Sequence, residues 1–129
     1  MDKRFIQVAG VLGALAVILG AFGAHALKEI LSEKSLQTFE VGVRYQFYHV
    51  FALLLVAILS KDFGGKLLKW SGNLFIIGIL LFSGSLYLLT YFQHNEMLSF
   101  YKIGAITPLG GLSFITGWIL LALAVTKKK

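Results

Sequence analysis

The first apolar stretch of the chain reads FIQVAGVLGALAVILGAFGAHAL over residues 5–27. It contains no Asp, Glu, Lys or Arg, and its only ionisable residue is His25 near its end. A hydrocarbon layer about 30 Å thick is crossed by about 20 apolar residues in a helix. This stretch is therefore long enough to span a membrane, and it decides the class of fold.

Three more apolar stretches follow, separated by short charged segments. The predicted spans cover residues 5–27, 38–60, 71–92 and 103–126. The 129 residues are 57% hydrophobic and only 14% charged, with a mean hydropathy of +0.80, whereas soluble domains carry about 25% charged residues. The sequence predicts an all-α fold, a four-helix transmembrane bundle that forms a single integral membrane domain over residues 1–129.

Small residues recur along the first span at the spacing that allows close helix packing. Ala9 and Gly13 are four residues apart, as are Ala16, Gly20 and Ala24. In lipid this small-xxx-small spacing lets two helix backbones approach each other. We expect the stripe to face another helix.

A secretory signal is the alternative interpretation of the same stretch. Lys3 and Arg4 precede it, and Ala24-His25-Ala26 resembles a cleavage site. Its apolar part exceeds the usual signal core of about 7–15 residues, which favours a retained membrane span.

The distribution of Lys and Arg predicts the orientation. Eight of the 12 basic residues lie on the side of the two termini and four on the other, so both termini should face the cytoplasm. Without Lys127, Lys128 and Lys129 the counts are five and four. Because the cations lie at span ends, we expect contacts with membrane lipids and none with nucleic acid.

Two local features bear on helix boundaries. Apolar residues at three- and four-residue steps from Leu36 predict that the second helix begins near Ser35, a potential N-cap. Pro108, near the first turns of the fourth span, predicts either a helix kink or the true helix start. Gly110 and Gly111 should weaken the helix there.

Polar residues at membrane depth gather at the end of the first span and the start of the second. Tyr45 and His49 are four residues apart and share one helix face with Tyr48 beside them. We expect them to line a pocket near the outer leaflet, with His25 on its other wall and Arg44 paired to Glu40 when the pocket is empty. The predicted ligand-binding residues are His25, Glu40, Arg44, Tyr45, Tyr48 and His49.

Three interpretations of this cluster stay open. The side chains either hold helices together, or form a binding or proton-handling site, or hold a metal or haem between two histidines, with no third ligand assured by spacing. A second polar set, Ser83, Ser85, Tyr87 and Thr107, either bonds to helix carbonyls or lines a substrate path. The sequence has no cysteine and shows no phosphate loop, HExxH or GxSxG signature, so we expect neither an enzyme nor a cofactor.

Four motifs recur in order along the chain. They are GAFGAH at 20–25, YQFYH at 45–49, FSGSLY at 82–87, and GAITPLGG at 104–111 followed by Gly117-Trp118. The whole chain thereby resembles the bacterial membrane family called domain of unknown function 423. The resemblance implies a small four-helix plasma-membrane protein and no particular activity. The polar loop at residues 93–102 looks longer than expected for the family, which puts a family role for His94 or Glu96 in doubt.

Two classes of function follow from these observations. The first is binding or transport of a small molecule, ion or lipid at the His/Tyr cluster. The alternative is a structural or assembly subunit whose glycine-rich helix faces dock to a larger membrane partner or to another copy in a homo-oligomer. An oxidoreductase subunit holding haem or quinone between the histidines is a third choice.

Overall fold

The computed structural model describes residues 1–96 and 100–126, and no strand occurs among them. Its elements are α1 (Lys3–Phe22), η1 (Gly23–Leu27), α2 (Lys28–Ile30), α3 (Glu33–Leu59), α4 (Lys66–Gly78), η2 (Ile79–Ser83), α5 (Gly84–His94), α6 (Phe100–Gly104) and α7 (Ile106–Ala124), where η marks a π-helical turn. They form four rods, each long and apolar enough to cross a membrane. The predicted all-α four-helix bundle is confirmed.

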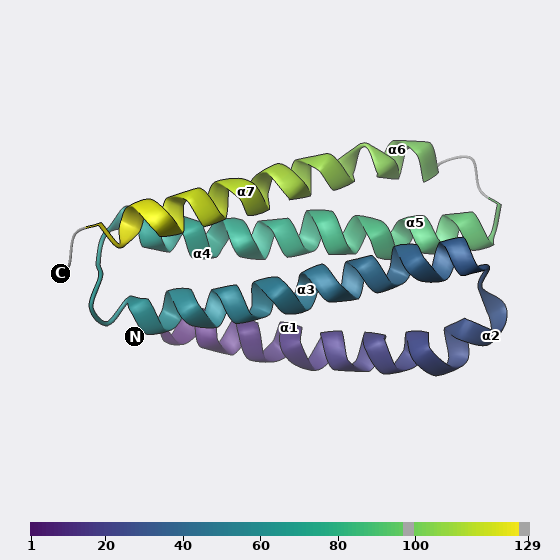
Figure 1. Ribbon diagram of the computed structural model, residues 1–129, viewed down its shortest axis with the longest axis horizontal. Coiled ribbons are helices and arrows are strands. Elements are labelled where there is room, and N and C mark those ends of the chain that lie inside the picture. Colours follow the sequence, from purple (N-terminus) through teal and green to yellow (C-terminus); the bar gives the residue numbers. More distant parts are fainter. Residues whose placement is uncertain (97–99, 127–129) are drawn as a thin grey trace.

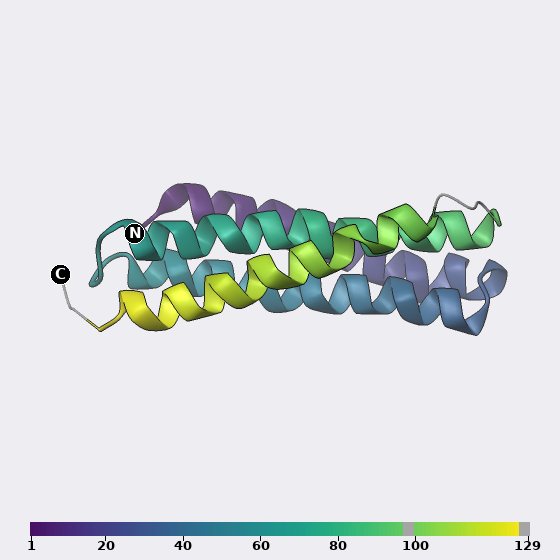
Figure 2. The ribbon, with the colours of Figure 1, turned by 90° about the horizontal axis from the view of Figure 1, so that it is seen from above.

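The four rods run antiparallel, so both chain termini lie at the same end of the bundle, here called the terminal end (Figure 1). The other end is called the far end. Rod α3 lies between α1 and α4–α5, and α4–α5 lies between α3 and α7. Seen from above, α7 crosses the bundle obliquely (Figure 2).

The small-residue stripe of α1 packs against α3, which confirms that it faces another helix. Ala9 and Ala16 are buried, and Cβ atoms added to Gly13 and Gly20 would touch α3 side chains at 3.4 and 3.5 Å. Ala24, in the π-helical turn, is exposed. The glycines of α1 with a neighbour in α3 therefore face inward, whereas Gly10 is exposed with nothing within 4 Å of an added Cβ.

Helix α3 begins earlier than the sequence pattern predicted. Its N-cap is Ser32, whose hydroxyl oxygen accepts the amide N–H of Ser35 at 3.2 Å, so the expected cap at Ser35 is wrong. The apolar periodicity starts only at Leu36 because the first turn does not need an apolar side chain. Its 27 residues are about 40 Å long at 1.5 Å per residue, so the ends project beyond a bilayer core.

Pro108 marks the start of the fourth long helix. It lies in the first turn of α7, where amide groups have no intrahelical acceptor and proline is tolerated. The structure thus selects the helix start over a kink. Gly110 and Gly111 do not interrupt α7. A Cβ at Gly110 would collide with the backbone of Phe82, so glycine allows α7 to touch η2 directly.

The terminal end ties the start of the chain to the end of α3. The Asp2 amide donates to Ser60 Oγ at 2.9 Å. The turn that follows contains Gly65 at φ +95°, a conformation that favours glycine. Exposed cations surround this end, namely Lys3, Arg4, Lys61, Lys66 and Lys69. Lys127, Lys128 and Lys129, on which the predicted orientation depends, lie outside the described residues.

Candidate functional site

Contacts between the rods show which residues lie at the same level along the bundle. Ser35 donates to Gln93 at 3.2 Å, so these residues of α3 and α5 lie level with each other. Trp70 is 54% exposed near the start of α4, as is typical of an interfacial indole. A hydrocarbon core needs about 20 helical residues, so its other edge lies near Thr90 of α5 and the neighbouring Thr38 of α3.

His49 lies deep in the bundle. At 1.5 Å per residue it lies about 16 Å along α3 from Thr38, toward the middle of the rod. Its Nδ1–H donates to the Tyr45 carbonyl at 2.7 Å, and its Nε2 accepts the Trp118 indole N–H at 3.0 Å. The ring stacks on Phe114 at 3.5 Å between centroids. Both ring nitrogens are in use, so His49 joins α3 to α7 and has none left for a metal.

Tyr45 and Tyr48 lie beside His49, as their spacing predicted. The Tyr45 ring centroid is 5.6 Å from Tyr48 and 6.3 Å from His49. Tyr45 is 37% and Tyr48 is 53% exposed, so they face outward. Glu40 and Arg44 are also exposed on α3, and no ion pair joins them in the described part of the chain.

His25 is not brought to this group. It is exposed in η1, two residues after Gly23, whose added Cβ would meet the Phe39 ring of α3. That level is about 15 Å from His49 along α3 at 1.5 Å per residue. The expected pocket between the two histidines is therefore not formed. Among the described residues no cluster of three His, Asp or Glu side chains could hold a metal ion.

Three hydroxyls of the second polar set bond between or along helices. Ser83 Oγ donates to the Gly42 carbonyl of α3 at 2.7 Å. Ser85 Oγ lies 2.6 Å from Thr107 Oγ1 of α7. These bonds fix η2 and α5 against both neighbouring rods. The sequence left two roles open for these hydroxyls, and this arrangement corresponds to helix packing, not to a substrate path.

Tyr87, the remaining member of the second polar set, bonds to Gln46, which was not among the predicted site residues. Its hydroxyl donates to Gln46 Oε1 at 2.6 Å, and Gln46 Nε2 donates to the Leu12 carbonyl at 2.7 Å. The three residues bridge α5, α3 and α1. Every buried side-chain N or O atom in the described residues has a partner. The buried polar side chains thus form hydrogen bonds within and between the helices.

The far-end pocket is a cavity of about 360 Å³ between the η1–α2 segment, α3 and α5. It lies across the edge of the hydrocarbon core near Thr90. One wall is apolar and the other, from α5, carries hydroxyl, imidazole and amide groups. Its lining residues are Leu27, Ile30, Leu31, Phe39, Tyr87, Thr90, Tyr91, His94 and Asn95.

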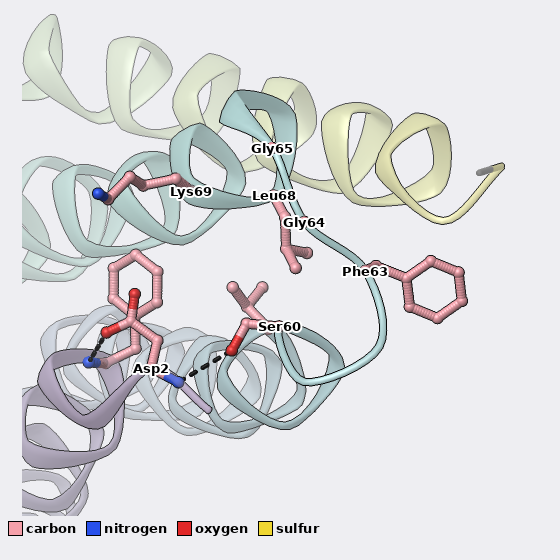
Figure 3. Close-up of a pocket in the computed structure, with 9 residues that line it drawn as sticks. Asp2, Ser60, Phe63, Gly64, Gly65, Leu68 and Lys69 are labelled. Atoms are coloured by element: carbon pink, nitrogen blue, oxygen red, sulfur yellow. Dashed lines mark hydrogen bonds between the residues drawn. The ribbon is translucent and has the colours of Figure 1, made fainter. Parts of the chain in front are cut away.

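The terminal-end pocket is a smaller cavity of about 170 Å³ (Figure 3). Its polar groups are largely committed to the fold. The Asp2 carboxylate accepts backbone amides of α1, and the Ser60 hydroxyl donates to a carbonyl of α3 at 2.6 Å. The Phe63 ring points away from the other lining residues (Figure 3). Ligand pockets usually measure about 300–1,000 Å³, so the far-end pocket is the better candidate.

The sequence did not reveal the far-end pocket as a site. None of the six predicted ligand-binding residues lines it, whereas Tyr87 of the second polar set does. A signal was available, because Tyr87, Tyr91 and His94 recur at four- and three-residue steps on one face of α5. The apolar wall gave no signal, since residues such as Ile30 resemble any lipid-facing side chain.

Comparison with known proteins gives consistent matches. The family described as protein of unknown function (DUF423) matches residues 19–111. The UPF0382 membrane protein YwdK of Bacillus subtilis is 43% identical over 97% of this chain and 98% of its own length. The UPF0382 inner membrane protein YgdD of Escherichia coli is 34% identical over 100% of this chain and 95% of its own. No solved structure gives a significant match.

These matches agree with the structure. The relatives are membrane proteins by name, and the chain has four rods that can span a membrane, so it is a membrane protein. The family resemblance inferred from four sequence motifs is confirmed. The chain belongs to the DUF423 family of bacterial membrane proteins, whose members here carry the name UPF0382.

Proposed function

We propose that this protein binds an amphiphilic, lipid-like molecule in the far-end pocket. It would do so as a multi-pass protein of the bacterial inner membrane with both termini in the cytoplasm. The location follows the relative named as an inner membrane protein. The orientation follows the excess of Lys and Arg on the side of the termini.

The observation that carries the proposal is the composition of the pocket across the membrane edge. Its apolar wall, which includes Ile30 and Phe39, suits a hydrocarbon chain. His94 and Asn95 at the end of α5 lie toward water and suit a polar headgroup. A volume of 360 Å³ falls in the range of small-molecule sites, which is about 300–1,000 Å³.

The interior of the bundle argues against an ion or proton route as the function. A conducting path needs polar groups that are free to exchange partners, and intramembrane ionisable groups commonly mark such paths. Here the buried polar side-chain atoms of the described residues are all hydrogen-bonded. Tyr87, which lines the pocket, has its hydroxyl bonded to Gln46.

Pocket filling tests the proposal. Ile30 lines the pocket and is 59% exposed, so Ile30→Trp should be tolerated while it occupies the cavity. The control is Ile119→Trp on α7, which is 55% exposed and lines none of the pockets described here. Each purified variant is titrated in mild detergent with the fluorescent fatty acid cis-parinaric acid.

We expect saturable binding by the parent chain and by the control, with affinity reduced about tenfold in Ile30→Trp, a loss of about 1.4 kcal/mol. Equal binding by both variants would show that the probe sits elsewhere and would overturn the proposal. Absence of saturable binding by the folded parent chain would overturn it too.

A further inference from the structure

One face of α3 carries an exposed seam that no other rod covers in the described part of the chain. Its members are Arg44, Tyr48, Phe51, Leu55 and Ile58. Tyr48 and Phe51 are 53% and 63% exposed. The steps between members alternate between four and three residues, the 3.5-residue spacing along which a second parallel helix packs in a left-handed pair.

The polar members of the seam lie at a depth where the hydrocarbon of the lipid cannot solvate them. Arg44 lies about 9 Å inside the membrane edge at Thr38, and Tyr48 lies near the midplane, at 1.5 Å per residue. Both side chains are exposed on the bundle surface. Polar and charged side chains at this depth normally face a protein partner or water.

The acidic and basic side chains on this face of one copy can pair with those of a second copy. Glu40 lies one helical turn before Arg44, on the same side of α3, and both are exposed. A twofold axis along the membrane normal would set two α3 helices side by side and parallel. Glu40 of each copy would then lie within one turn of Arg44 of the other, which gives two equivalent ion pairs.

We propose that the α3 seam is the interface of a homodimer, held by reciprocal Glu40–Arg44 pairs between two copies of this chain. A different partner would have to supply its own acid and base at matching depths, whereas a second copy supplies both by symmetry. The inference does not depend on the ligand proposed above, because the seam and the far-end pocket share no residue.

The absence of cysteine makes the interface directly testable. A disulfide between two molecules of a single-cysteine variant joins the same position of two copies, and it forms only when their Cα atoms approach within about 7 Å. Tyr48→Cys and Leu55→Cys sample the seam. Ile18→Cys on α1 is the control, since it is 62% exposed and lies at a similar depth.

Oxidation in native membranes should convert most of the Tyr48→Cys and Leu55→Cys protein to disulfide-linked dimer and leave Ile18→Cys monomeric. Equal cross-linking at all three sites would indicate random collision and would overturn the proposal. Lack of cross-linking at both seam positions would leave lipid or another protein as the occupant and would equally overturn it.

Charge exchange tests the ion pairs themselves. Arg44→Glu places four acidic groups at the interface and should weaken dimerisation of the Tyr48→Cys protein about tenfold. The double variant Glu40→Arg, Arg44→Glu restores opposite charges across the axis and should recover the dimer. If Arg44 instead reaches lipid phosphates alone, the single and double variants will cross-link like the parent, and the pairing is wrong.

Discussion

His49 shows how a titratable residue is accommodated at the midplane of a membrane. A charged side chain at the centre of a spanning helix costs about 2.5–3.5 kcal/mol on insertion scales. The neutral imidazole avoids this cost, because one ring nitrogen donates to the Tyr45 carbonyl and the other accepts from Trp118. His49, which the sequence suggested as a functional histidine, therefore has both ring nitrogens hydrogen-bonded within the bundle.

Gly110 is required by the contact between α7 and η2. An added Cβ would collide with the backbone of Phe82, which cannot move aside as a flexible side chain can. We expect Gly110→Ala to destabilise the bundle by about 1–3 kcal/mol through overpacking, measured by unfolding in detergent and denaturant. Gly84→Ala is the control, because nothing lies within 4 Å of its added Cβ. Equal loss in both variants would contradict a specific contact at Gly110.

At the scale of elements, α4 and α7 hold each other by two hydroxyl bonds in opposite directions. Ser71 of α4 donates to the Gly117 carbonyl of α7 at 2.7 Å, and Ser113 of α7 donates to the Leu74 carbonyl of α4 at 2.7 Å. Between helices in lipid, where hydrophobic burial contributes little, such bonds and close packing stabilise the contact.

Removal of these hydroxyls should weaken the helix pair in steps. Measured bonds of this kind average about 0.6 kcal/mol, so Ser71→Ala and Ser113→Ala should each reduce unfolding free energy by about that amount and the double variant by about 1 kcal/mol. Thr116→Ala removes a hydroxyl that bonds only within α7 and serves as control. A similar loss in Thr116→Ala would mean that the interhelical bonds are not the stabilising ones.

At the scale of the whole molecule, the antiparallel rods bring both termini to one end (Figure 1). The exposed cations at that end include Lys61 and Lys66 in the turn between α3 and α4. Basic residues in short connections are retained on the cytoplasmic side. We therefore expect the termini in the cytoplasm and the far-end pocket at the outer leaflet.

Reporter fusions check this orientation. A fluorescent protein fused after Lys129 should fold and fluoresce, and alkaline phosphatase at that position should stay inactive, because both reporters would lie in the cytoplasm. Phosphatase fused after Ser32 should be active outside it. The reverse pattern would place the termini outside and the far-end pocket in the cytoplasmic leaflet.

The sequence by itself determined the four spans, the inward stripe on α1 and the family. These features depend on local composition, helical periodicity and motif order, which one chain segment carries alone. It also gave the neighbours Tyr45, Tyr48 and His49 on one helix face, since that is a matter of spacing along a single helix.

The tertiary structure alone decided which polar groups meet. Trp118 reaches His49 across a separation of 69 residues, and Gln46 joins Leu12 to Tyr87. Periodicity defines the faces of a helix, but neither its rotation against a neighbour nor its height in the membrane. Those are set by side-chain packing between rods, so the burial of His49 and the far-end pocket could be known only from the assembled bundle.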